Sequence, residues 1–526
     1  MATAPTAPTP PTAPPRAPRA SGRAWLLALL VGLLTAALAY ALMPVGSRGP
    51  LEFTGPEAVA EPVRASLDGV EHQVQALEVG RDTGTGREYV AAGEVGGPGG
   101  TAAPGPVTHF ETGSVFKVFT AMTLADMVDK GELELDTTLG EVFDEVEFAD
   151  PRMAGVTLEE LATHRSGMPA VPTGYEAAGT GSMTMGMDPY RAMPSAEEGL
   201  AVTRLGARDE FAYSNLGFMV LGRALARVSG TDFPDLVRER IFDPVKMDDT
   251  FVLGADRAEV PEDTALPHRE MGQRVQTWRA PDWAPAGVGT FTTADDLLRF
   301  GAAVRDGEAP GMAAVEPRAE AGGKVRIGLA WFTAKSPGGA VRTLHDGKTG
   351  GSSSLLAFDD DQVVVALSNS GQVSAGQAAL AALGEQDIPL ASEDPFVVDT
   401  GTAAASTLPL VVLPPLFALA LMLRRRTLVG QRHLDRLRVV SMPLGAFALV
   451  LSGLTGFGWA IFPHALWAGA VGAVAAALTV GLSLAPALPT VRARWAWLRV
   501  AFFAVSVTAS LLLIAFTGWT LAVLDS

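Results

Sequence analysis

The sequence predicts an α+β domain built on an antiparallel sheet flanked by helices, joined to α-helical segments that span a membrane. Three observations support this fold class. Short apolar runs alternate with Gly-rich turns at 73–109 and again at 340–369, as antiparallel strands do. A helix that is apolar nearly all round begins at Ser114, and such helices are usually buried inside a domain. Uncharged apolar runs long enough to cross a bilayer lie at both ends of the chain.

Charge is distributed unevenly along the 526 residues, whose net charge is −17. Residues 1–43 contain three Arg and no acid, and residues 424–526 contain nine Arg and two acids, so residues 44–423 carry a net charge of −27. An acidic body between basic, apolar ends argues against nucleic-acid binding and indicates a soluble domain tethered to a membrane. The absence of cysteine excludes disulfides, a thiol nucleophile and a zinc–thiolate site.

The N-terminal part predicts a tail and an anchor. Residues 1–23 are Ala/Pro/Thr-rich and too poor in apolar residues to fold, so we expect a disordered cytoplasmic tail. Residues 24–43 then form an uncharged apolar run of spanning length. The alternative is a cleavable signal peptide, because Ala39-Tyr40-Ala41 resembles a cleavage site. The run exceeds the usual 7–15 residue core of a signal peptide, so we favour a retained transmembrane anchor.

The sequence of the C-terminal region, 396–526, predicts four more transmembrane helices, and the connections between these helices differ in charge. The four apolar segments are 403–423, 439–462, 465–488 and 500–524. Arginines gather in the connections at 424–438 and 492–499, whereas the connection at Pro463-His464 has no Lys or Arg. A cytoplasmic N-terminus puts both basic connections on the cytoplasmic side, as the positive-inside rule requires. Residues 44–395 are then an extracytoplasmic domain.

Ser114 and Lys117 stand three residues apart at the predicted start of the buried helix, so their side chains share one face. Backbone N–H groups and the positive end of the helix dipole would lie near the hydroxyl. A partly desolvated lysine loses its proton more easily than it does in water. Together they form an activated nucleophile, although Ser-x-x-Lys alone also occurs by chance.

Two further segments carry candidate side chains. Tyr213 and Asn215 directly precede an apolar helix at 218–228; the phenol can relay a proton and the amide can bind a substrate amide. Taken alone, a core tyrosine and a helix-start asparagine are the simpler interpretation. His164 follows a capping-box helix and has no identifiable acid partner, so we interpret it as structural. The long loop at 171–194 is either a binding loop or disordered.

These motifs follow one another along the acidic central part of the chain. In this order they make it resemble the serine β-lactamase and penicillin-binding superfamily, in particular its class C β-lactamase-related branch of D-stereospecific peptidases and esterases. The resemblance covers about 73–372 and rests on Ser114-x-x-Lys117, Tyr213-Ser214-Asn215 and His345-x-Gly347 in that order. It implies a β-lactamase-like fold, with an all-helical subdomain beside the antiparallel sheet.

The resemblance also implies the role of each site residue. Ser114 would be the acylated nucleophile, with Lys117 and Tyr213 as its proton-handling pair, and which of the two is the base stays open. Asn215 would bind the substrate amide. The N–H groups of Ser114 and Lys348 would form the oxyanion hole.

The third motif can be aligned in two ways. Lys348-Thr349-Gly350 copies the superfamily's third motif literally, but the pattern His345-x-Gly347-x-Thr349-x-Gly351 fits the branch better. We therefore place His345 and Gly347 in the substrate site and assign Lys348 a backbone role.

The leading hypothesis is a multi-pass membrane protein of the cell envelope. It would hydrolyse D-amino-acyl amide or ester bonds through an acyl-enzyme, in a cell-wall peptide, a wall-polymer ester or an acylated metabolite. A β-lactamase is a weaker variant. A poorly deacylating sensor that signals through its membrane helices is an alternative, and a transporter is disfavoured because the spans lack ionisable residues. We expect no cofactor, no metal and no nucleic-acid partner, and protein partners of the helices are not defined by the sequence.

Overall fold

A computed structural model describes most of the chain, and the chain forms two compact units, 1–43 with 400–519 and 44–399 with 520–526. The described residues are 20–42, 51–68, 71, 74–96, 102–269, 273–336, 338–371, 373–384, 400–423, 435–453, 462–488 and 496–524. Residues 1–19 of the tail predicted at 1–23 and the arginines at 424–432, 492 and 494 lie outside them, whereas Gly22 and Arg23 already belong to the helix Gly22–Leu42.

A nine-stranded antiparallel sheet forms the centre of the larger unit, in the order β1-β3-β2-β14-β13-β12-β11-β10-β9. The strands are β1 (Phe53–Thr54), β2 (Ala76–Asp82), β3 (Arg87–Gly93), β9 (Ala319–Gly322), β10 (Val325–Ile327), β11 (Phe332–Lys335), β12 (Val341–Lys348), β13 (Ser353–Phe358) and β14 (Val363–Ser368). The N-terminal hairpin β2–β3 therefore pairs with the last strand, β14. The predicted antiparallel sheet is confirmed.

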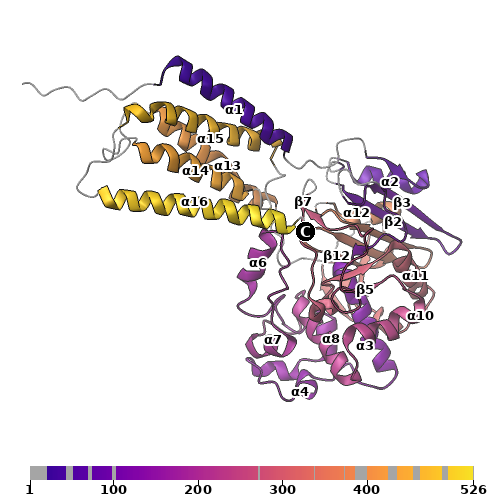
Figure 1. The fold of residues 1–526 in the computed structure, drawn as a ribbon. Helices are drawn as coiled ribbons and strands as arrows, with labels where there is room; N and C mark the ends of the chain where they lie inside the picture. The colour runs from indigo at the N-terminus through magenta and orange to yellow at the C-terminus, as the bar shows by residue number, and fades with distance from the viewer. Residues whose placement is uncertain are drawn as a thin grey trace, which may run out of the picture. The chain divides into compact units, whose positions relative to one another are not determined.

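Helices cover both faces of this sheet. One face packs against α2 (Glu57–Ser66) and α12 (Ala375–Ala382) through a shared apolar core, and Figure 1 shows α2 beside β2 and β3. The other face packs against α11 (Ala294–Arg305), which lies directly on the strands. A Cβ on Gly80 would lie 2.8 Å from Leu298, and one on Gly301 would lie 2.5 Å from Val363. Glycine at both positions is what lets α11 approach the sheet so closely.

The helical subdomain follows β4 (Phe110–Glu111). Its longer helices are α3 (Phe116–Asp129), α6 (Glu176–Thr184), α7 (Ala196–Val202) and α8 (Asn215–Ser229); its shorter elements include α4 (Leu139–Val142), α5 (Leu158–Ala162), α9 (Phe233–Val237) and α10 (Asp243–Val245). A small sheet, β4-β8-β5, joins it to the rest through β8 (Thr290–Thr292) and β5 (Phe251–Val252). The predicted capping box of α5 is present, and α8 ends at Gly230 in the left-handed conformation. The predicted all-helical subdomain is confirmed.

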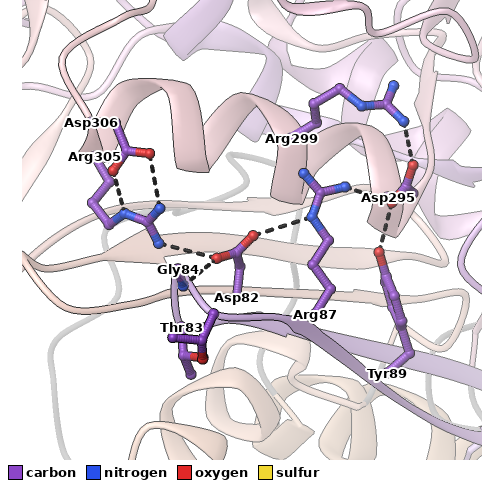
Figure 2. A network of polar contacts seen from close by, with 10 residues as sticks. Asp82, Thr83, Gly84, Arg87, Tyr89, Asp295, Arg299, Arg305 and Asp306 are labelled. Carbon is purple, nitrogen blue, oxygen red and sulfur yellow. Dashed lines mark hydrogen bonds and ion pairs between the residues drawn. The ribbon is translucent and has the colours of Figure 1, made fainter.

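An ion-pair network fastens the β2–β3 hairpin to α11 (Figure 2). Asp82 accepts hydrogen bonds from Arg87 at 3.1 Å and from Arg305 at 3.2 Å. Asp295, at the start of α11, accepts from Arg87 at 2.8 Å and from the Tyr89 hydroxyl at 2.7 Å. Because each carboxylate meets more than one donor, the network fixes the hairpin against the helix more firmly than an isolated surface pair would.

Glu78 is a buried carboxyl in β2, and neither of its oxygens has a hydrogen-bond partner among the described residues. Burial raises the pKa of Glu78 from 4.5 to about 8. The folded state thus binds a proton that the unfolded chain releases above about pH 4.5, so this group costs stability progressively as pH rises from about 4.5 to 8.

Replacing Glu78 with glutamine should remove this cost. We expect the stability of Glu78→Gln relative to wild type to rise by roughly 3 kcal/mol between pH 5 and pH 8. Thermal unfolding of the full chain in detergent at the two pH values measures this change. An equal offset at both pH values would contradict the assignment of a protonated Glu78.

The smaller unit is a set of apolar helices: α1 (Gly22–Leu42), α13 (Thr400–Leu423), α14 (Arg436–Gly453), α15 (His464–Leu484) and residues 496–519 of α16 (Ala496–Leu524). Among the described residues, four helices are long and apolar enough to cross a membrane, namely Gly22–Leu42, Arg436–Gly453, His464–Ala487 and Ala496–Thr520. The apolar part of α13, Thr407–Ala420, is shorter than the fifth span that the sequence predicts.

Helix α1 packs alongside α15, as Figure 1 shows. A Cβ on Gly32 would lie 3.0 Å from the Gly472 carbonyl oxygen, so the two backbones meet at small residues, as packed membrane helices commonly do. The Tyr40 and His464 rings are 6.1 Å apart, and hence α1 and α15 run antiparallel. Arg436, at the start of α14, donates to the Ala485 carbonyl at 3.0 Å, at the end of α15. Arg23 and Arg436 therefore lie at the same end of this unit.

Candidate active site

Ser114 lies in a 3-10 turn, Gly113–Val115, that runs directly into α3. Gly113 has φ +52°, and a Cβ there would lie 2.9 Å from both the nitrogen and the carbonyl oxygen of Lys348. A Cβ on Gly347 would lie 2.8 Å from the Ser114 nitrogen. Glycines at 113 and 347 thus allow the start of α3 to press against the end of β12, which brings the backbone N–H groups of Ser114 and Lys348 into one neighbourhood.

Lys117 is completely buried, and its Nζ lies 2.9 Å from Ser114 Oγ. The same nitrogen donates to the Ala286 carbonyl at 2.7 Å, which holds the side chain in place. Its Nζ also lies 4.9 Å from the centre of the Tyr213 ring and 5.6 Å from that of Phe218. The serine–lysine spacing on one helix face, predicted from sequence, is present, and the start of α8 lies beside it.

Asn215 is the first residue of α8, and Ser214 caps the helix by accepting from the Gly217 N–H at 2.8 Å. The Asn215 amide nitrogen donates to the hydroxyl of Tyr190 at 2.7 Å, and its Oδ1 has no hydrogen-bond partner among the described residues. An orphaned, buried amide oxygen is costly unless a ligand completes it. This oxygen is a suitable acceptor for a substrate N–H group.

His164 packs against Tyr213 with ring centres 4.3 Å apart, and its Nδ1 accepts from the Ser214 N–H at 3.1 Å. The proton of the neutral ring therefore lies on Nε2. Burial, followed by the charge of Lys117, holds the pKa of His164 well below its usual value. The ring supports the Tyr213–Ser214 backbone in the way a structural histidine does.

The sequence pattern at 340–344 predicts a strand that ends before His345, but β12 runs four residues further, to Lys348, so His345 lies inside the strand. It is fully buried, and its Nδ1–H donates to the Ala330 carbonyl at 2.8 Å, which leaves Nε2 as a bare acceptor. Burial and the Lys117 charge lower the pKa of His345 to about 3, so the imidazole is neutral. Lys348, the last residue of the strand, is half-buried.

Tyr190 is the neighbour of Asn215 that sequence reasoning missed. It belongs to the 171–194 segment, which folds into α6 and a packed turn instead of staying irregular. The ring of Tyr190 packs against Trp278 and Trp283, with ring centres 5.2 and 4.9 Å away. No local pattern marks Tyr190, because its role depends on contacts with residues distant in sequence. Among the described residues no cluster of His, Asp or Glu could hold a metal ion.

A serine hydroxyl 2.9 Å from a buried lysine nitrogen, at the start of a helix and near the backbone N–H groups of Ser114 and Lys348, is the arrangement of a serine hydrolase. The family model for Beta-lactamase matches residues 79–388, and the chain belongs to this family.

Individual relatives agree with this assignment. Penicillin-binding protein 4 of Amycolatopsis lactamdurans is 28% identical over 208 residues, 38% of this chain and 52% of that protein. The D-alanyl-D-alanine-carboxypeptidase/endopeptidase AmpH of Escherichia coli (strain K12) is 29% identical over 165 residues, 29% of this chain and 39% of that protein. The chain thus spans about half or less of the length of these curated relatives.

Solved structures show the same fold. The D-stereospecific amidohydrolase from a Streptomyces species superposes with a TM-score of 0.52 at 22% identity, covering 62% of this chain and 97% of that one. The class C beta lactamase from Rhodobacter sphaeroides superposes with a TM-score of 0.51 at 19% identity, covering 62% of this chain and 99% of that one. At these identities the likeness establishes the β-lactamase-like fold alone.

Proposed function

We propose that the protein is a membrane-anchored, extracytoplasmic serine hydrolase that cleaves D-amino-acyl amide or ester bonds through an acyl-enzyme on Ser114. The contact of 2.9 Å between Lys117 Nζ and Ser114 Oγ carries this proposal, because it places the nucleophile against one member of the proton-handling pair in a buried setting. Because their pKa values are lowered, His164 and His345 are neutral and add no positive charge near Lys117.

The reaction follows from the arrangement. Ser114 Oγ attacks the substrate carbonyl while its proton passes to the Lys117–Tyr213 pair. The negative oxygen that develops is stabilised by the N–H groups of Ser114 and Lys348. The pair returns the proton to the leaving amine or alcohol as the acyl bond to Ser114 forms. Water then hydrolyses the acyl-enzyme and frees Ser114.

The substrate class rests on two observations. The bare Oδ1 of Asn215 can accept the N–H of an amino-acyl group bound next to Ser114. Relatives of this chain include a D-alanyl-D-alanine-carboxypeptidase/endopeptidase and a fold neighbour that is a D-stereospecific amidohydrolase. Cell-wall peptides, wall-polymer esters and acylated metabolites all present such bonds.

A covalent probe and a chiral substrate panel test this function. The full chain, purified in detergent, should react with a fluorophosphonate probe or a fluorescent penicillin. It should then hydrolyse D-alanyl p-nitroanilide faster than the L-isomer. A stable adduct with no turnover of any panel member would instead favour a sensor, and equal rates for both isomers would remove the D-specificity.

The third motif yields a separate prediction. If neutral His345 lines the site through its bare Nε2, His345→Ala should lower kcat/KM by about 10- to 100-fold. Lys348→Ala should change it little, because only the backbone N–H of Lys348 is assigned a role. Steady-state kinetics on one ester substrate compares the two. A loss confined to Lys348→Ala would reverse the alignment of the motif.

Sidedness can be tested with single cysteines in this cysteine-free chain. Arg23 and Arg436 lie at one end of the helical unit, which fits one cytoplasmic face under the positive-inside rule. Asp361→Cys, on an exposed turn of the hydrolase domain, should react with an impermeant maleimide in intact cells. Ser21→Cys, exposed at the start of α1, should react only after lysis. The opposite pattern would place the hydrolase domain in the cytoplasm.

A further inference from the structure

Glu111 is a buried carboxyl that the proposed reaction does not use. It lies in β4, three residues before Ser114, and is 2% exposed. One of its oxygens accepts the Thr349 hydroxyl at 2.5 Å, and the other accepts the Trp278 N–H at 3.2 Å. Glu111 thus links the strand that directly precedes the nucleophile's turn to Thr349, the residue that follows Lys348.

The Thr349 hydroxyl has a single proton, and the hydrogen bonds around its oxygen determine which acceptor receives it. Its oxygen accepts the N–H groups of Ser352 at 3.1 Å and of Gly351 at 3.4 Å, while the Thr349 N–H donates to the Ser352 carbonyl at 2.9 Å. These bonds close the turn 349–352. The hydroxyl proton therefore points to Glu111, and the position of the turn depends on that carboxyl.

Both partners of Glu111 donate, which suits a carboxylate better than a neutral acid or an amide. Burial raises the pKa of Glu111 to about 7, and the Thr349 hydroxyl, the Trp278 N–H and the nearby Ser352 hydroxyl oppose that rise. Above pH 7 the carboxylate predominates. A glutamine of the same shape would turn an N–H group toward one of the two donors and leave that contact unmade.

We propose that Glu111 is a positioning residue: through the Thr349 turn, it holds the Lys348 N–H where that group stabilises the tetrahedral intermediate. The proposal rests on the proposed function of Ser114 and Lys348. Gly113 meets Lys348 so closely that even a Cβ would clash, so a small displacement of the turn changes the oxyanion site directly. An oxyanion donor acts in the transition state and contributes little to substrate binding.

The test compares variants of the full chain at pH 8 with p-nitrophenyl butyrate as the probe. Glu111→Gln and Thr349→Val should each lower kcat by about 10- to 100-fold, with KM changed less than about threefold. The double variant should lose little more than either single variant, because both remove one contact. Thr349→Ser keeps the hydroxyl and should recover most of the rate that Thr349→Val loses.

Glu78→Gln is the matched control, since it also replaces a buried carboxyl with an amide, but Glu78 lies in β2 and has no hydrogen-bond partner among the described residues. It should retain the wild-type kcat. Wild-type kcat in a folded Glu111→Gln variant would overturn the proposal, as would equal kcat in Thr349→Val and Thr349→Ser. If Glu111→Gln does not fold, the comparison of kcat between Thr349→Val and Thr349→Ser tests the proposal. Hydrolysis by wild type that persists in Ser114→Ala would contradict the proposed function instead.

Discussion

Replacing Ser114 with alanine should abolish covalent labelling and lower kcat/KM by at least about 1000-fold. The acyl-enzyme cannot form without the hydroxyl, and the remaining backbone donors can only polarise a bound carbonyl. The fold should persist, because a small side chain is lost and Lys117 keeps its bond to the Ala286 carbonyl. In-gel fluorescence with the probe and initial rates on an activated ester measure both effects.

Ser374→Ala provides a control for this experiment. Ser374 caps α12 by accepting the Gln377 N–H at 3.2 Å and lies outside the site. Its loss should cost about 1 kcal/mol of stability and leave labelling intact. Labelling of Ser114→Ala at the wild-type level would remove Ser114 as the nucleophile.

Lys117→Met should lower kcat/KM by about 100- to 10,000-fold, and Tyr213→Phe should also cause a large loss. Methionine keeps most of the volume of the fully buried lysine, so the loss reports on the amine rather than on a cavity. The double variant should lose far less than the product of the two factors, because the two groups handle one proton as a unit. Pre-steady-state acylation rates on one ester give all three values.

A fully multiplicative loss would show that Lys117 and Tyr213 act in separate steps. Circular dichroism and thermal unfolding of each variant provide the control for folding. Phe218, whose ring also faces Lys117 at 5.6 Å, supplies a neighbour without a proton to relay. Phe218→Leu should therefore leave the coupling between Lys117 and Tyr213 unchanged.

Local signals predicted much of the fold. The helix that follows Ser114 is apolar nearly all round and ends before Gly131, which has a positive φ in the structure. Turns and alternating strands marked the sheet, and the fold class is confirmed by the topology. Spacing also placed Ser114 and Lys117 on one face, because three residues make nearly one helical turn.

These local patterns could not predict contacts between residues that lie far apart in the sequence. Asn215 meets Tyr190, 25 residues away, and Thr349 meets Glu111, 238 residues away. Both contacts depend on tertiary packing, which no short sequence pattern encodes. His345 was predicted to follow a strand, but pairing with Leu356 of β13 extends β12 past it. Strand ends are set by such partners as well as by the residues themselves.

The pairing of an early strand with the last strand of the sheet also has a consequence for the rate of folding. Strand β2 pairs with β14, and the Ala76 N–H meets the side chain of Asn369, 293 residues later in the chain. At about 5–20 residues per second, synthesis of that interval takes on the order of 15–60 s, during which the β2–β3 hairpin has an unpaired edge. Unpaired edges attract other strands. A fragment that stops before residue 363 should therefore aggregate, whereas a circular permutant that places β14 directly before β2 should fold faster, because it forms that pairing locally.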